Sequence, residues 1–507
     1  WPQAYVCTSH EVLCEMREFE RFATTVVNAS LLPVMDSYLD HLERGLRERD
    51  VAVEPRIMQS NGGAVAPLSV RQLPVNTFFS GPAAGVIGAA RLGRRSNSPN
   101  LITFDMGGTS TDVCLIQDGE PAMHNERQIA GLPVRIRTID IHTVGAGGGS
   151  IAWVDAGGLL KVGPRSAGAV PGPAAYDRGG VEPTVTDANL VLGRLAPNDL
   201  LGGRMHCSIE HAAAAVDRVA APLGLDRLTA AAGIVQIVNV NMMGALRVVS
   251  VERGQDPRDF ALLAFGGAGP LHAVEVAQQL GIKRVIIPGH PGLLSALGLL
   301  EADARTDLSL TRIVEAKHES LPVLAAGLRE LAQRSVAWLA QEGLHDASAV
   351  VERVIDMRYL GQSFEIGIVH SAESLHEADL TALVEQFHTQ HERLNGYASR
   401  EHAVEVVTLR CAVVVPRGLS AALAAQAIST VNLSVHHPQS MAQREVWFEF
   451  SGLVDTPVYD RTALDAGAHF EGPAIVAQMD ATTLIPPGYE VHVNEFLHLV
   501  IEATGDV

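Results

Sequence analysis

Apolar and polar positions alternate in two different periods along this chain, and together they predict a mixed α/β protein. Short apolar runs at 101–104, 113–116 and 260–265 have the length of buried strands. Within 1–50, apolar residues recur at helical spacing and predict a long helix. Residues 445–507 instead alternate apolar and polar positions between Pro/Gly turns, which is typical of a small β-rich module.

The octapeptide 105–112, Asp-Met-Gly-Gly-Thr-Ser-Thr-Asp, joins the first two apolar runs and predicts a phosphate-binding turn. Gly107 and Gly108 permit a tight turn in which backbone N–H groups approach an anion closely. The hydroxyl residues Thr109, Ser110 and Thr111 add further donors. Carboxylates stand at both ends, at Asp105 and Asp112. A bare carboxylate repels phosphate, so we expect these two to act through Mg²⁺ or a water.

The segment after the octapeptide restricts the kind of nucleotide site. A P-loop or a dinucleotide fingerprint places its glycine turn at the start of a helix, whereas here a second apolar run and an Asp118-Gly119 turn predict a β-hairpin. Both of those motifs are therefore poor fits. The plain alternative is a hairpin whose turn happens to be rich in Gly and Thr.

Three more glycine-rich turns accompany the first. Gly266, Gly267 and Gly269 lie between the third apolar run and a helix expected over 270–280. Residues 77–85 enter a helix of small residues, and 142–150, which includes Gly147 and Gly148, is the most glycine-dense stretch of the chain. Each turn alone fits ordinary loop punctuation. Four of them within 77–269 favour one nucleotide cleft assembled from several loops.

The motifs resemble those of the hydantoinase A / 5-oxoprolinase family, which includes the ATP-dependent subunits of N-methylhydantoinases, 5-oxoprolinases, lactamases and acetone-type carboxylases. The similar segments run nearly from end to end. They are residues 9–13, 24–29, 59–63, 80–85, 104–112, 142–150, 167–174, 265–272, 294–298, 357–363 and 472–475.

The resemblance implies an α/β ATPase fold of the kind shared by actin, sugar kinases and heat-shock chaperones. On this interpretation 1–50 is a helical linker, 51–310 an actin-like ATPase domain, 311–420 an α+β domain and 421–507 a β-rich C-terminal module. Family members begin with another domain that carries a first Asp-x-Gly-Gly-Thr loop. Nothing before Trp1 supplies that loop in this sequence, so half of the phosphate clamp is expected to come from elsewhere.

The resemblance also implies an activity. We expect an ATP-dependent cyclic amide hydrolase that phosphorylates a ring carbonyl oxygen, with ATP and Mg²⁺ as cofactors and a B-type subunit as partner in a hetero-oligomer. The implied phosphate and nucleotide contacts are Gly107, Gly108, Thr109, Ser110, Thr111, Gly147, Gly148, Gly266, Gly267 and Gly269, with Asp105 and Asp112 at the metal. Two alternatives stay open: an acetone- or acetophenone-type carboxylase subunit, which would share every motif, and an inactive structural subunit.

Three single side chains have two interpretations each. His142, at the start of the glycine-dense loop, is either a polar tether for that loop or an acid/base group or substrate contact. Asp140 and Asp187 are either metal carboxylates or ordinary aspartates at strand ends.

Composition excludes several classes of protein. The chain has 507 residues, 47% of them hydrophobic and 19% charged, which excludes a disordered chain. A net charge of −19 argues against nucleic acid as a partner. The apolar stretch around 234–243 is interrupted by amides, so we expect no membrane anchor. Five scattered cysteines favour reduced thiols in a cytoplasmic protein over disulfides or a zinc site.

Overall fold

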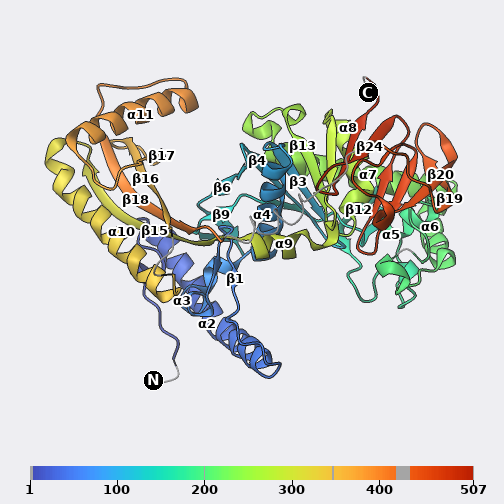
Figure 1. Cartoon of the computed structure of the whole chain (residues 1–507), viewed down its shortest axis with the longest axis horizontal. Helices are drawn as coiled ribbons and strands as arrows, with labels where there is room; N and C mark the ends of the chain where they lie inside the picture. The colour runs from blue at the N-terminus through green and yellow to red at the C-terminus, as the bar shows by residue number, and fades with distance from the viewer. Residues whose placement is uncertain (1–3, 199, 345–347, 418–433, 506–507) are drawn as a thin grey trace. The chain divides into compact units, whose positions relative to one another are not determined.

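The computed structural model describes residues 4–505 apart from 199, 345–347 and 418–433 (Figure 1). Two compact units divide the chain, and each is built from stretches that are distant in sequence. Unit 1 comprises Trp1–Ser80, Met123–Thr138 and Ala302–Gly418, and unit 2 comprises Gly81–Ala122, Ile139–Glu301 and Leu419–Val507. The range 51–310, expected to be one domain, thus contributes to both units. The first part of the expected C-terminal module, through residue 433, lies outside the described residues.

Unit 2 is organised around a mixed sheet that brings together strands from three parts of the chain. Its central strands are β3 (Leu101–Met106), β13 (Ala261–Phe265) and β14 (Arg284–Ile287), which run parallel. The order β10-β4-β3-β13-β14-β25-β24-β21 extends this core with antiparallel neighbours. The remaining strands of that order are β4 (Thr111–Gln117), β10 (His142–Val144), β21 (His469–Glu471), β24 (Tyr489–Val493) and β25 (Leu499–Ala503).

Helices cover both faces of this sheet, as the strands' nearly continuous apolar character requires. Alternate side chains such as Phe104 and Leu262 pack into a core with α7 (Arg227–Val249) and α8 (Gly269–Leu280). The intervening side chain of Phe265 faces the other way, onto Gly85 of α4 (Ser80–Arg95). The strands expected at 101–104, 113–116 and 260–265 and the helix expected over 270–280 are confirmed.

Two smaller parts complete unit 2. A four-stranded sheet in the order β19-β20-β22-β23 supports its own apolar cluster with α5 (Val185–Val191) and α6 (Ile209–Leu223). Its strands are β19 (Ala442–Phe448), β20 (Gly452–Asp460), β22 (Ala474–Ala477) and β23 (Thr482–Ile485). A separate hairpin pairs β11 (Ser150–Val154) with β12 (Leu160–Ser166).

One helical stretch of the described chain, Arg227–Arg253, is long and apolar enough to cross a membrane by length and composition. Half of the most apolar 18-residue segment of this stretch is buried inside the protein. Its main part, α7, packs against α5, α6, α8 and β4, as the core helix of a globular unit does.

Unit 1 consists of a long antiparallel sheet and the helices that cover it. The sheet has the order β15-β18-β16-β17, formed by β15 (Ala304–Glu315), β18 (Val404–Val415), β16 (Val350–Tyr359) and β17 (Ile366–Val369). Helix α10 (Leu321–Gln341) packs on β15 and β18, and α11 (Glu377–Asn395) packs on β17 (Figure 1).

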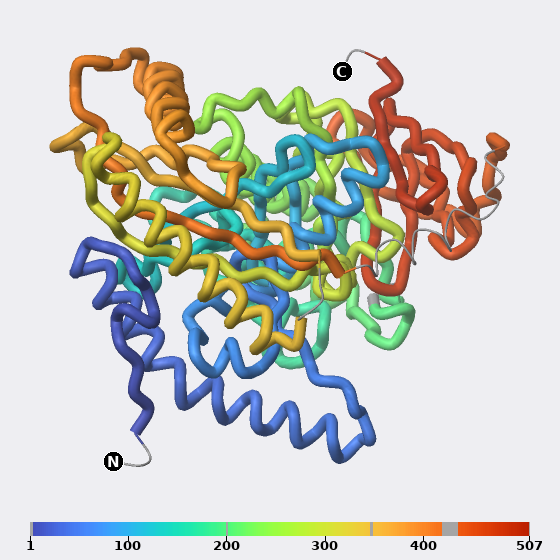
Figure 2. The backbone as a smooth tube through the Cα atoms, turned by 60° about the vertical axis from the view of Figure 1, so that its left-hand side comes forward, coloured from blue at the N-terminus to red at the C-terminus, as the bar shows by residue number. Residues whose placement is uncertain are grey.

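The N-terminal helix expected within 1–50 is α2 (Glu18–Arg47), the long helix near the N-terminus in Figure 2. It contacts the short strand β8 (Leu132–Val134) and the helix α3 (Pro67–Gln72) of the same unit. Val27 of α2, Val75, Val134 and Ile136 form the small apolar cluster that holds these segments together.

Candidate functional site

The octapeptide forms the predicted hairpin between β3 and β4. Asp105 is the register partner of Asp112, and Met106 that of Thr111, so the turn is only the four residues between them. The Gly107 N–H donates to the Ser110 carbonyl at 3.1 Å and closes the turn. Gly107 and Gly108 have open space on the side where a Cβ would project, which leaves their backbone accessible.

The glycine-dense loop lies directly on this turn. The N–H groups of Gly148 and Gly149 donate to the carbonyls of Gly107 and Gly108 at 3.0 and 2.6 Å. A Cβ on Gly147 would clash with the backbone of Thr109, so only glycine allows this approach. The buried Thr111 hydroxyl donates to the Ala146 carbonyl at 2.6 Å and ties the loop to the hairpin.

The turn between β13 and α8 meets the hairpin from the parallel strand beside it. Its Ala268 N–H donates to the Met106 carbonyl at 3.0 Å. Gly266 has a φ of +78°, and a Cβ there would collide with the Asp105 carboxylate and the Met106 backbone. Three of the four predicted turns therefore converge. The remaining one, at 77–85, leads into α4, where Gly85 packs on Phe265.

Asp105 and Asp112 form an electrostatically unfavourable pair when no cation is bound. Burial, reinforced by the charge of Asp112, raises the pKa of Asp105 from 3.8 to about 7. Burial also raises the pKa of Asp112, opposed by a hydrogen bond from the Thr143 hydroxyl. No group of three or more His, Cys, Asp or Glu side chains able to hold a metal occurs among the described residues. Two neighbouring carboxylates that resist joint ionisation nevertheless fit a divalent cation whose other ligands are waters and phosphate oxygens.

Above the joined turns lies a cavity of about 310 Å³ within unit 2. Gly107, Gly108, Gly148 and Gly267 line it. The segment 478–482 and helix α5 also contribute to its lining. This volume is in the range of a small-molecule pocket. Backbone N–H groups at the turns and polar side chains at the wall, such as Asp480 and Asn189, give it the donors and acceptors that a polar ligand requires.

A buried hydrogen-bond network supports the α8 side of the cavity. His272 is 1% exposed, and its Nδ1 donates to Asn239 Oδ1 at 2.8 Å while its Nε2 accepts from Asn189 Nδ2 at 3.3 Å. Asn239 continues the network to Glu275, which forms a bidentate ion pair with Arg194 at 2.7 and 3.0 Å. Burial lowers the pKa of His272 to about 4, so the ring is neutral at physiological pH.

Comparison with known proteins agrees with this architecture. The family described as Hydantoinase/oxoprolinase matches residues 21–308, and its C-terminal domain matches 313–502. Together these matches cover most of the chain. The chain belongs to the hydantoinase/oxoprolinase family.

Relatives within the hydantoinase/oxoprolinase family have more than one activity. Caprolactamase subunit alpha of Pseudomonas jessenii is 37% identical over 97% of this chain and 71% of its own length. The acetophenone carboxylase gamma subunit of Aromatoleum aromaticum is 31% identical over 98% of this chain and 69% of its own length. The crystal structure of the ATP-dependent caprolactamase from P. jessenii superposes with a TM-score of 0.84 at 36% identity, covering 98% of this chain and 72% of that one.

In this member of the hydantoinase/oxoprolinase family, the other predicted side chains have clear places. His142 begins β10, opposite Val113, and is not among the described residues that line the cavity. Asp140 forms an ion pair with Arg253. Asp187 is fully buried and caps α5, because it accepts hydrogen bonds from Thr184, Ala174 and Ala175.

Several side chains at this hydantoinase/oxoprolinase site carried no usable sequence signal. Thr143, which binds Asp112, is one of many threonines. Asp480 lines the cavity and accepts from the Gly292 N–H at 2.8 Å, although it lies far from every glycine turn in sequence. Asn189 sits within an ordinary helix. Long-range strand pairing, rather than any local motif, brings these residues to the site.

Proposed function

We propose that the chain is the ATP-dependent subunit of a cyclic amide hydrolase and that unit 2 is built on the actin-like ATPase fold. One observation carries the proposal: three glycine turns, joined by backbone hydrogen bonds, border a cavity. Two carboxylates flank the first of these turns, although neither is among the described residues that line the cavity. That arrangement suits phosphoryl transfer, in which the protein mainly positions the phosphates and neutralises their charge. The caprolactamase relative supports a lactam or similar ring as the substrate class.

The chemistry answers a defined problem. Resonance with nitrogen makes an amide carbonyl a poor electrophile. Transfer of the γ-phosphoryl group from ATP to the carbonyl oxygen breaks the bond between the γ-phosphorus and the bridging oxygen and releases ADP. Water then adds to the ring carbon, and the C–N bond breaks to give the ring-opened amine and an acyl phosphate. A second water hydrolyses the acyl phosphate to the carboxylate and phosphate. We assign that hydrolytic half to a B-type partner subunit.

Each residue of the site has a defined part in this chemistry. The backbone N–H of Gly108 faces the phosphates, while that of Gly107 closes the turn. Gly266 and Gly267 leave room for the nucleoside. Asp105 and Asp112 hold Mg²⁺, directly or through waters, and the cation supplies positive charge against the phosphate oxygens. Thr143 orients Asp112 through its hydroxyl.

A carboxylase subunit is the second candidate function, and the 31% identity to the acetophenone carboxylase gamma subunit supports it. In that branch the phosphoryl group goes to bicarbonate or to a ketone enolate rather than to a ring amide. The two candidates share the nucleotide site, so only the second substrate separates them.

The test is ATP hydrolysis by the full chain, alone and with its B-type partner, against hydantoin, 5-oxoproline, lactams, and acetone with labelled bicarbonate. Ring opening coupled to ADP release, and lost in Asp105→Ala, supports the hydrolase. Substrate-dependent incorporation of the label supports the carboxylase. An inactive structural subunit would show neither turnover nor a nucleotide-induced rise in melting temperature.

A further inference from the structure

Unit 1 contains a separate, smaller cavity with a strongly charged lining. Its volume is about 100 Å³, room for several waters since each needs roughly 10–15 Å³ of such space. The segment after α1 (Ser9–Val12), the segment 135–137, β15, α10 and β18 contribute to its wall. Four arginines and three carboxylates line it: Arg135, Arg137, Arg334, Arg410, Glu11, Glu15 and Asp307.

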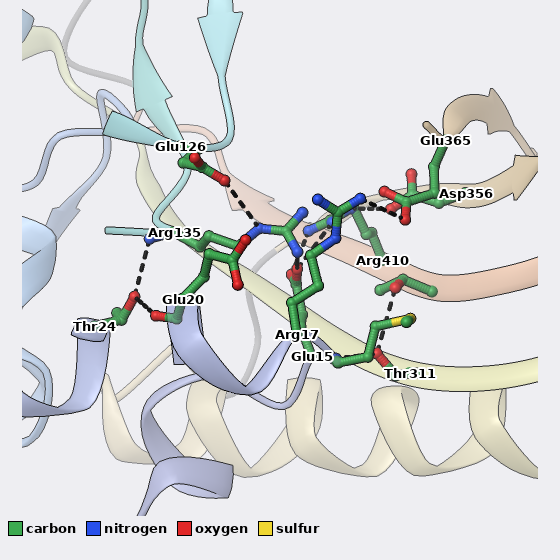
Figure 3. A network of polar contacts seen from close by, with 12 residues as sticks. Glu15, Arg17, Glu20, Thr24, Glu126, Arg135, Thr311, Asp356, Glu365 and Arg410 are labelled. Carbon is green, nitrogen blue, oxygen red and sulfur yellow. Dashed lines mark hydrogen bonds and ion pairs between the residues drawn. The ribbon is translucent and has the colours of Figure 1, made fainter. Parts of the chain in front are cut away.

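Glu15 is fully engaged within this lining (Figure 3). It is 4% exposed and accepts from two nitrogens of Arg410, at 2.6 and 3.2 Å, with Arg135 a further 3.4 Å away. Arg410 also donates from Nε to Asp356 at 2.7 Å. The charge of Arg410 is therefore matched by two carboxylates, and Glu15 is already paired with two arginines.

The other two carboxylates are engaged as well. Asp307 accepts from Arg305 at 3.0 Å and from Asn61 at 2.7 Å. Glu11 is exposed and accepts from the Thr8 backbone N–H in a helix cap. Each carboxylate of the described wall thus already has a hydrogen-bond donor.

Two arginines in this wall retain unused donors. Arg334, on α10, donates to the Ser309 carbonyl at 3.1 Å, and no carboxylate lies within 4.0 Å of it among the described residues. Arg137 forms only a long ion pair with Asp307, at 3.7 Å, and shares that carboxylate with Arg305; its buried Nε has no hydrogen-bond partner among the described residues. A half-buried guanidinium with no anion, as for Arg334, or with only a long and shared ion pair, as for Arg137, is costly, because both its charge and its N–H groups lose solvation.

We propose that this cavity is a binding site for a small oxyanion, held by the guanidinium groups of Arg334 and Arg137. The planar fork of arginine matches a carboxylate or phosphate group and makes charge-assisted hydrogen bonds to it. The small volume admits one such group and excludes a nucleotide. The oxyanion is either the carboxylate of a larger organic molecule or a free inorganic ion.

The test is a titration of the full chain, at constant ionic strength, with acetate, inorganic phosphate, 5-oxoproline and 2-pyrrolidinone. The heat of binding is measured by calorimetry, and the melting temperature is measured with each compound. The last two compounds share a ring and differ in the carboxylate. Binding of 5-oxoproline or acetate but not 2-pyrrolidinone identifies an organic carboxylate as the ligand. Binding of phosphate alone identifies a free ion. Both results support the site if Arg334→Gln and Arg137→Gln each weaken binding about tenfold or more.

Two further variants make the outcome decisive. Arg329→Gln removes an exposed arginine from the same helix, and it should bind like the parent chain. Arg334→Lys keeps the charge without the fork and should bind with intermediate affinity even if Arg334→Gln does not fold. The proposal is overturned if no oxyanion binds, or if binding in the folded arginine variants equals that of the parent.

Discussion

Asp105 at the end of β3 lies opposite Asp112 at the start of β4, and the charge of Asp112 makes Asp105 harder to ionise. The register of the hairpin fixes this relationship. Burial is the larger cause of the raised pKa of Asp105, and the charge of Asp112 adds to it. The hairpin therefore holds an electrostatic strain that a bound cation would relieve.

Replacing Asp105 by Asn should stabilise the metal-free chain at alkaline pH. The folded pKa of about 7 lies above the ordinary 3.8, so the folded state binds this proton more tightly than the unfolded state does. The resulting destabilisation is absent below about pH 4, grows as pH rises, and is complete above pH 7. Relative to the parent chain, Asp105→Asn should thus raise the free energy of unfolding by on the order of a few kcal/mol at pH 8 and leave it unchanged at pH 4.

Urea unfolding at pH 4 and pH 8 measures this difference. Asp118→Asn, at the exposed far end of the same strand pair, is the matched control and should show no pH-dependent gain. Equal stability of Asp105→Asn and the parent at pH 8 would contradict the electrostatic account. Under the proposed function, the same substitution abolishes ATP turnover.

Gly266→Ala should abolish nucleotide binding by disrupting the joined turns. The substitution places an alanine at a positive φ, where it is strained, and its Cβ would collide with Asp105 and Met106. Gly254→Ala separates the two causes, because Gly254 also has a positive φ, of +74°, but open space around it. Gly254→Ala should cost about 1 kcal/mol and leave nucleotide binding intact. Similar nucleotide affinities in both variants, measured by calorimetry, would refute the steric argument.

His272 should make unit 2 sensitive to acid. Its folded pKa of about 4 lies below the usual 6.5, so the unfolded state takes up the proton first as pH falls. The free energy of unfolding should therefore be at its full value above pH 6.5 and fall by on the order of 2–3 kcal/mol on acidification to pH 4. In His272→Gln, which cannot titrate at this position, the free energy of unfolding should change less between pH 6.5 and pH 4. His290→Gln, at an exposed histidine of the same unit, should leave it unchanged.

The Arg194–Glu275 pair should show strong coupling. Arg194 is only 2% exposed, and its loss would leave Glu275 without a counter-ion beside the cavity. Arg194→Met and Glu275→Gln should each destabilise by about 3–5 kcal/mol. The double variant should lose clearly less stability than the sum of the two single losses. Chemical denaturation of the parent, the two single variants and the double variant measures this. Additive losses would mean that the pair is not an energetic unit.

Local signals made the hairpin predictable. Two apolar runs separated by Gly-Gly and flanked by Asp need only neighbouring residues to form, so its strands, its turn and the facing of Asp105 and Asp112 follow from short-range geometry. The helix after Gly269 and the long N-terminal helix are predictable for the same reason, because their periodicity lies within one segment.

The sequence by itself thus determined the short-range elements and, through its motifs, the family. The tertiary structure alone decided that the 142–150 loop and the 266–269 turn lie on the hairpin while the 77–85 turn does not, and that Asp187 is a helix cap. It also decided that β25, from the chain's end, pairs with β14 in the same sheet. These outcomes depend on pairing between strands far apart in sequence, and such pairing is selected by burial of the whole core rather than by any local pattern.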